Sequence, residues 1–162
     1  MGLLKPLGGE VTVTIDAPVA DVWALVSDVT RIGEFSPETF EAVWTHGATG
    51  PAVGARFKGH VKRNGVGPVY WTPCTVTQCV EPSADREGVF EFGVGLDDRP
   101  INTWGYRLRP LAPDRTEVTE YFRLTPAWYI RGYWLLLGRL RAKTNERGMR
   151  TTLERMKAVL EV

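Results

Sequence analysis

The sequence predicts an α+β domain in which a curved antiparallel sheet of seven strands wraps around one long C-terminal helix. Short segments of alternating apolar and polar residues follow one another from residue 40 to residue 124, separated only by turns. The last 36 residues contain no proline and many strong helix formers. A helix of that length needs a sheet to pack against, because its apolar face must be buried. At 162 residues, the chain is expected to form a single domain.

Composition excludes several classes of function. Hydrophobic residues make up 43% and charged residues 24%, values typical of a soluble globular protein. The net charge is +1, so no global basic field indicates nucleic-acid binding. The apolar run near Leu135 is far below the ~20 residues that span a bilayer. Residues 1–10 do not resemble a signal peptide, and we expect a cytoplasmic protein.

The cysteines and histidines give no metal or cofactor signal. Cys74 and Cys79 are five residues apart in a predicted strand, which places them on opposite faces and disfavours a disulfide. No cluster of Cys and His with zinc-ligand spacing exists. His60 shares a strand face with basic residues, which indicates an exposed side chain. We therefore expect neither metal nor cofactor.

The first 35 residues predict one strand and two short helices. Val11, Val13 and Ile15 alternate with threonines, as in a half-buried strand. Asp16 is suited to capping a helix over residues 17–27, with Pro18 in its first turn. A second helical turn is expected over residues 29–35.

Six meandering strands are then predicted, each pairing with its predecessor. They cover roughly residues 40–45, 55–62, 69–80, 90–94, 104–108 and 118–122. Pro73 predicts an edge position or a bulge in the third of these. Alternation places a set of aromatic residues on the inward face, namely Phe57, Phe90, Phe92, Trp104, Tyr106 and Phe122. A curved sheet with aromatic residues on its concave side is typical of a fold that encloses a ligand-binding cavity.

The final helix, residues 126–162, is not uniformly amphipathic. A core stripe formed by Met149, Leu153, Met156 and Leu160 continues towards the N-terminus as mostly small or polar residues, among them Asn145, Ala142 and Gly138. Either the helix kinks near Gly138 or Gly148, or these small residues form the roof of a cavity. The opposite side carries Tyr133, Leu136, Leu137 and Leu140, flanked by basic residues. That side is either solvated or a contact surface for a homodimer or, transiently, a membrane.

Four segments in this order resemble the START/Bet v 1-like (SRPBCC) superfamily, in particular the bacterial polyketide cyclase/dehydrase and lipid-transport group. They read IDAPVADVWALVSDVTRIGEFSPE, GARFKGH, TWGYRLRP and RTEVTEYF, and the resemblance covers about residues 10–161. It implies the helix-grip fold and a hydrophobic cavity between the sheet and the C-terminal helix. The superfamily includes carriers, sensors, plant hormone receptors and cyclases, so the resemblance implies no single chemistry.

Glu120 is the leading polar candidate, because it alternates with Val118 and Phe122 and should point into the apolar interior. There its pKa would be raised, and it would serve as acid, base or anchor for a ligand. A structural ion pair with Arg107 or Arg131 at the rim is the simpler interpretation.

The leading functional hypothesis is binding or carriage of a small hydrophobic molecule such as a lipid, a sterol-like compound or a polyketide. The predicted ligand-binding residues are Phe57, Tyr70, Phe90, Phe92, Trp104, Tyr106, Glu120, Phe122, Trp128, Gly138 and Ala142. Access would require movement of residues 95–100 and 47–54. The alternative is a polyketide aromatase/cyclase using Glu120, Tyr106 and Arg107. No nucleophile-elbow or phosphate-binding motif competes with these hypotheses.

Overall fold

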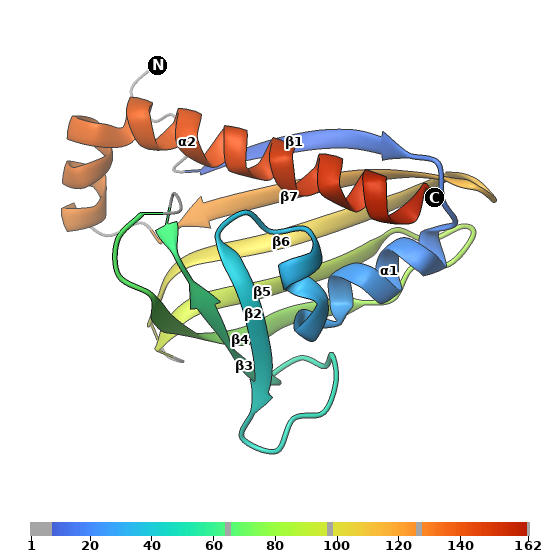
Figure 1. The fold of residues 1–162 in the computed structure, drawn as a ribbon, viewed down its shortest axis with the longest axis horizontal. Helices are drawn as coiled ribbons and strands as arrows, with labels where there is room; N and C mark the ends of the chain where they lie inside the picture. The colour runs from blue at the N-terminus through green and yellow to red at the C-terminus, as the bar shows by residue number, and fades with distance from the viewer. Residues whose placement is uncertain (1–7, 64–65, 97–98, 126–127, 162) are drawn as a thin grey trace.

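The described part of the chain forms seven strands and three helices (Figure 1). The computed structural model describes residues 8–63, 66–96, 99–125 and 128–161, and their side chains except those of residues 96, 99, 128–131 and 133–141. The elements are β1 (Gly8–Ile15), α1 (Val19–Ser27), the 3-10 helix η1 (Val29–Glu34), β2 (Thr39–Thr45), β3 (Arg56–Val61), β4 (Tyr70–Val80), β5 (Gly88–Leu96), β6 (Arg99–Ala112), β7 (Arg115–Leu124) and α2 (Trp128–Leu160). The predicted fold class is confirmed.

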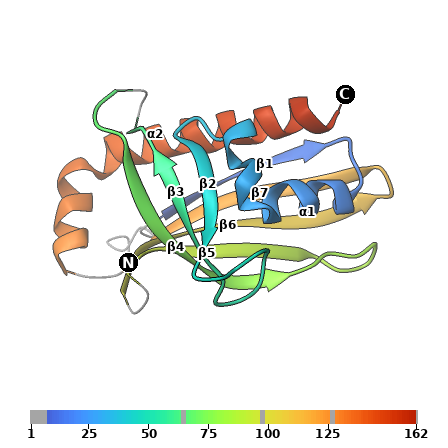
Figure 2. The ribbon, with the colours of Figure 1, turned by 60° about the horizontal axis from the view of Figure 1, so that its bottom comes forward.

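The strands form one antiparallel sheet in the order β1-β7-β6-β5-β4-β3-β2. The meander from β2 to β7 is the predicted one. The pairing of β1 with β7, in which Val11 lies opposite Glu120, was not predicted. Figures 1 and 2 show the sheet curling strongly, so that β2 and β3 run across the direction of β1 and β7.

The helices cover only part of the concave face. Helix α2 packs against β1 and, less extensively, against β7 and η1, whereas α1 packs against β5, β6 and β7. Ile15, Val22, Leu25, Leu108, Val118 and Leu153 are fully buried where these elements meet. The inner faces of β3, β4 and the neighbouring part of β5 lie away from both helices. This arrangement leaves room for a cavity.

Helix α2 has the predicted core stripe and one of the two features that the sequence left as alternatives, a bend. Its predicted core stripe is confirmed, since Met149, Leu153 and Met156 are buried. Figures 1 and 2 both show its N-terminal turns set at an angle to the rest of the helix, so α2 is bent. The side chain of Leu135 and the small residue Gly138 lie outside the described side chains, as do Tyr133, Leu136, Leu137 and Leu140. The proposed contact surface therefore stays a prediction.

Two local predictions need correction. Pro18, rather than Asp16, occupies the N-cap position of α1, with no side-chain capping bond. Asp16 instead accepts a hydrogen bond from Arg115 (Oδ1···Nε 3.1 Å), because the β1–α1 corner lies beside the start of β7. The capping carboxylate is Asp28, which accepts a hydrogen bond from the Thr30 backbone N–H at the start of η1.

Strand β4 is an interior strand, but Pro73 lies where β4 pairs only with β3 and not with β5. The missing N–H of proline is therefore tolerated locally, as at an edge. The bulge of β4 lies instead between Val76 and Gln78. It shifts the alternation of the strand, so that Cys79 pairs with Phe90 and packs against the core on the same face as Cys74. The prediction of opposite faces was wrong, and both cysteines are free.

The convex face of the sheet carries a network centred on Tyr121. Its ring lies over Gly105, and its hydroxyl donates to Glu91 (Oη···Oε2 2.6 Å). Thr77 donates to the other carboxylate oxygen (2.8 Å), and Arg123 lies over the Tyr121 ring at 4.9 Å. Burial opposes the ionisation of Glu91, but hydrogen bonds from Tyr121, Thr77 and Gln78 and the nearby Arg123 outweigh it and lower its pKa.

The contact between Gly105 and Tyr121 predicts the effect of a substitution on stability. A Cβ at Gly105 would lie 2.5 Å from the ring and hydroxyl of Tyr121, which is tied to Glu91 and cannot easily shift. We expect Gly105→Ala to lower the free energy of unfolding by about 1–3 kcal/mol, as other overpacking substitutions do. Urea denaturation measures this change.

Gly148→Ala is the matched control, because nothing lies within 4 Å of a Cβ at this helical position. It should raise stability by about 0.5–1 kcal/mol through helix propensity. Equal stability changes in the two variants would contradict the proposed contact.

Candidate ligand-binding site

A cavity of about 420 Å³ lies between the concave face of the sheet and α2. Its walls come from β3–β7, from the turn between η1 and β2, and from α2. The volume falls within the range of about 300–1,000 Å³ that is usual for small-molecule sites. Its exposed lining residues, Pro37, Arg63, Tyr70 and Ile101, mark an opening where the β3–β4 and β5–β6 hairpins approach the helices.

Each strand from β3 to β7 contributes at least one aromatic ring to the wall. Phe57 and Phe92 meet edge to face, with ring centroids 5.2 Å apart and planes at 74°. Trp104 and Phe122 are a directly opposed pair of β6 and β7, with centroids 5.2 Å apart and planes at 30°. Trp104 is half-buried and Phe122 is buried. Such walls suit apolar ligands of flat or extended shape.

Glu120 lies in this wall beside Tyr106, its partner across β6 and β7. Both residues are only 5% exposed. The Tyr106 hydroxyl donates a hydrogen bond to Oε1 (3.2 Å), while Oε2 has no hydrogen-bond partner among the described residues. Burial raises the pKa of Glu120 to about 8, although the Tyr106 hydrogen bond opposes the shift. Burial and the adjacent Glu120 raise the pKa of Tyr106 well above its usual value. Glu120 is therefore a neutral acid at pH 7.

Asn102 is a lining residue that the sequence analysis missed. Its Oδ1 is buried and also has no hydrogen-bond partner within the described part of the chain. Asn102, Trp104 and Tyr106 alternate on β6 and so share its inner face. The alternation itself could have identified Asn102, but a polar residue near a hairpin is more often solvated.

The roof consists of residues of α2, namely Thr144, Asn145, Gly148, Met149 and Thr152. Of the small and polar residues that one interpretation of the sequence placed there, Asn145 lines the cavity, Ala142 does not, and Gly138 lies outside the described side chains. Thr152 donates to the Gly148 carbonyl within the helix (2.9 Å) and so presents little free hydrogen-bonding capacity. The roof contributes volume, while the hydrogen-bonding groups without partners belong to the sheet.

Seven predicted ligand-binding residues line the cavity: Phe57, Tyr70, Phe92, Trp104, Tyr106, Glu120 and Phe122. Phe90 is buried in the core against Trp23 of α1 and does not line the cavity. Ala142 is half-buried and also lies outside the lining. The side chain of Trp128 and the predicted roof residue Gly138 lie outside the described side chains, as does Arg131.

Arg107 lies on the opposite face of the sheet from the cavity, contrary to the predicted catalytic set. It forms an ion pair with Glu10 (2.5 Å) and lies over the Tyr121 ring. Because neighbouring residues of a strand point to opposite faces, Tyr106 and Arg107 cannot both face the cavity. The proposed ion pair between Arg107 and Glu120 is therefore wrong.

The other reactive side chains offer little for catalysis. Cys74 lines the cavity, but burial raises the pKa of its thiol to about 12, so it is not a ready nucleophile. His60 lies outside the cavity lining, stacked on Trp71 (4.2 Å) and hydrogen-bonded to Glu41 (2.7 Å). Within the described ranges, no three His, Cys, Asp or Glu residues are grouped to hold a metal ion.

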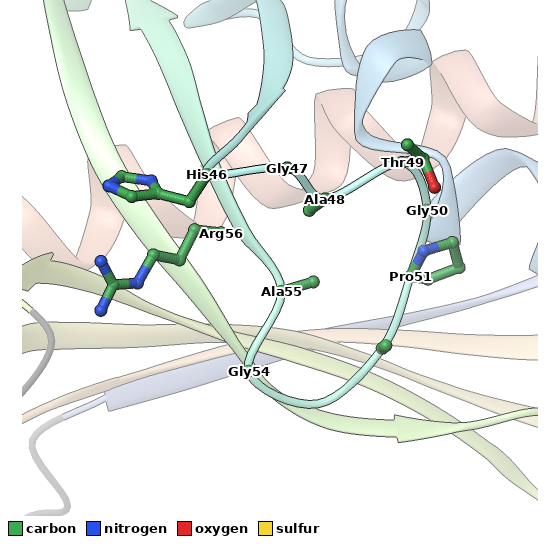
Figure 3. A pocket seen from close by; sticks show the side chains of 10 residues that line it. His46, Gly47, Ala48, Thr49, Gly50, Pro51, Gly54, Ala55 and Arg56 are labelled. Carbon is green, nitrogen blue, oxygen red and sulfur yellow. The ribbon is translucent and has the colours of Figure 1, made fainter.

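A second hollow lies in the loop between β2 and β3 (Figure 3). It is lined by residues 46–52 and 54–56, mostly small side chains and backbone, with His46 and Arg56 pointing to the same side. It is open to solvent and contains no buried polar group without a partner in the described part of the chain. Residues 47–54 border this hollow rather than the cavity, so their predicted role in ligand access has no support.

Several solved structures share the fold of this chain. A START superfamily protein from Mycobacterium smegmatis is similar over 95% of this chain and 97% of its own, with 14% identity and a TM-score of 0.70. The di-domain ARO/CYC BexL of the BE-7585A biosynthetic pathway is similar over 91% of this chain and 46% of its own, with 15% identity and a TM-score of 0.65. A Polyketide_cyc-like protein from Corynebacterium glutamicum shares 29% identity over 97% of this chain and 86% of its own, with a TM-score of 0.51.

A sequence profile described as polyketide cyclase/dehydrase and lipid transport matches residues 8–161. The chain belongs to this family, and the suspected assignment is confirmed. None of the curated proteins compared matches the chain. Family and fold together indicate a domain for hydrophobic ligands. Among the described residues, no helix is long and apolar enough to cross a membrane.

The buried carboxyl of Glu120 predicts a pH-dependent stability. Its pKa is about 8 in the folded chain against an ordinary 4.5, so between these values unfolding releases a proton. The free energy of unfolding should therefore fall as the pH rises through this window. Glu120→Gln cannot ionise and should gain stability relative to wild type between pH 5 and pH 9, on the order of a few kcal/mol. Urea denaturation at both pH values measures the difference.

Glu117→Gln provides the control on the same strand. Glu117 is paired with Arg109, which lowers its pKa, so its contribution is lost only below the usual carboxylate range. Its substitution should shift stability equally at pH 5 and pH 9. The same result for Glu120→Gln would show that Glu120 is already ionised at pH 5.

Proposed function

We propose that the protein binds or carries a small hydrophobic molecule, such as a lipid, a sterol-like compound or a polyketide, in the cavity between the sheet and α2. The observation that carries this proposal is a cavity with aromatic walls and two buried hydrogen-bonding atoms without partners in the described part of the chain. Burial of apolar ligand surface contributes about 25 cal/mol per Å². A few polar groups then orient the ligand.

The packing supports a cavity that is kept open. A void of this size forfeits contacts that a packed core would make, so an unfilled cavity destabilises the fold. The large side chains around it already pack against one another in pairs, and Gly148 in the roof adds no side chain. A ligand of matching shape would restore the missing contacts.

A substitution in the roof tests the proposal. Gly148→Phe places a ring in the open space above the sheet, where a Cβ meets nothing within 4 Å. Native mass spectrometry should show a discrete added mass on the purified wild-type protein that disappears on denaturation, and this mass should be absent from Gly148→Phe. Arg147→Phe, which adds the same side chain at an exposed neighbouring position, should keep the added mass.

Solvent extraction of the wild-type protein should then yield an apolar compound. The result that contradicts the proposal is a wild-type protein that carries no added mass and also shows no saturable binding of a neutral apolar probe such as trans-stilbene.

An aromatase/cyclase-type enzyme is the second candidate. The neutral carboxyl of Glu120 beside the Tyr106 hydroxyl favours it, because together they provide a proton donor and acceptor inside an apolar chamber. The fold likeness to one part of BexL supports the same idea. Arg107, on the other face of the sheet, is no longer part of the catalytic set.

If the protein acts in this way, Glu120→Gln should lower the turnover of a poly-β-ketone thioester by about 10²–10⁴-fold, the usual contribution of acid–base catalysis. Product formation followed by chromatography measures the rate, and Arg107→Gln on the convex face should leave it unchanged. Full turnover in Glu120→Gln would exclude this mechanism.

A further inference from the structure

The two hydrogen-bonding groups without partners lie at opposite ends of one aromatic surface. Asn102 and Tyr106 lie four positions apart on β6, roughly 14 Å at about 3.4 Å per residue. Glu120 lies directly opposite Tyr106 on β7. Between them lie Trp104 and Phe122, the opposed pair whose rings are 5.2 Å apart. Along its length, the inner surface of β6 and β7 therefore has a polar group at one end, an aromatic pair in the middle and polar groups at the other end.

Both polar groups are costly to leave without a partner. Buried donors or acceptors that lack a hydrogen bond destabilise a fold by about 1–3 kcal/mol each. Glu120 Oε2 and Asn102 Oδ1 are the buried side-chain atoms in this condition within the described part of the chain, and both residues line the cavity. Their shared location indicates that a ligand supplies the missing partners.

Resting on the proposed function, we infer that the cavity selects an elongated, uncharged molecule with an apolar middle and a hydroxyl or carbonyl group at each end. One end would hydrogen-bond to Glu120 and the other to Asn102, while the middle packs on Trp104 and Phe122. A molecule with a single polar end would leave one of the two groups without a partner.

The chemistry of the two groups favours neutral ends. Glu120 is protonated at pH 7, so it offers a hydroxyl donor to a ligand oxygen, and its Oε1 is already engaged by Tyr106. The Asn102 amide carries both a donor and an acceptor. A hydroxyl donates and accepts, so it can satisfy either group. Among the described residues, an anionic end beside Glu120 would meet no cation, because Arg107 and Arg123 belong to the convex face and Arg63 is an exposed lining residue at the opening.

Three probes of one shape test the inference: trans-stilbene, 4-hydroxy-trans-stilbene and 4,4′-dihydroxy-trans-stilbene. Their binding is followed at pH 7 by quenching of tryptophan fluorescence, since Trp104 lies in the wall. Each hydroxyl should tighten binding on the order of tenfold, because it gives a partner to one buried polar group.

Two variants show which protein group binds each hydroxyl of the probe. Glu120→Met and Asn102→Leu each remove one hydrogen-bonding group at similar side-chain size. Each should abolish the advantage of the dihydroxy over the monohydroxy probe while still binding trans-stilbene, which shows that the cavity is intact. Thr103→Val, next to Asn102 on the convex face of β6 and outside the cavity lining, is the control and should keep the full preference.

Three outcomes would overturn the inference. If all three stilbenes bind wild type with equal affinity, the cavity is a hydrophobic site without polar ends, and the proposed function survives. If the preference persists in both Glu120→Met and Asn102→Leu, other groups recognise the hydroxyls. If no stilbene binds, the proposed function fails together with the inference.

Discussion

The cavity exists because one helix cannot cover a sheet that curves this strongly. Helix α2 packs mainly on β1, at one edge of the sheet, and α1 fills the space against β5, β6 and β7. Among the described elements, no helix packs on the inner faces of β3 and β4, and Phe57 of β3 packs against Phe92 of β5 instead. The bend of α2 and the small residues of its roof preserve the remaining space. Sheet curvature and helix placement thus determine where a ligand can lie.

The two faces of the sheet shift the pKa of their buried carboxyl groups in opposite directions. On the convex face, Glu91 receives hydrogen bonds from Tyr121 and Thr77 and lies near Arg123, so it is held ionised. On the concave face, Glu120 has one hydrogen bond and no cation beside it among the described residues, so burial keeps it neutral. The first arrangement stabilises the sheet around Gly105. The second leaves hydrogen-bonding capacity without a partner among the described residues, which is why we propose that the concave face is the functional one.

Binding and catalysis would use the same groups in this cavity. A neutral carboxyl beside a tyrosine hydroxyl can orient a ligand oxygen, and the same pair can move a proton if the ligand is reactive. The apolar wall excludes water in either case. The difference between a carrier and an enzyme of this family therefore depends on the chemistry of the bound molecule as much as on the residues that hold it.

The sequence by itself determined the order of the elements, the meander from β2 to β7 and the aromatic part of the wall, because a period of two assigns each strand residue to a face. The position of Glu120 followed from the same alternation. Only the tertiary structure decided the rest, since those features depend on partners far apart in the chain. The pairing of β1 with β7 sets the edge on which α2 packs, and the bulge in β4 reverses the face of Cys79. Arg107 forms an ion pair with Glu10, which lies almost a hundred residues earlier. Alternation places Asn102 on the inner face, but only the cavity distinguishes it from a solvated residue of a hairpin.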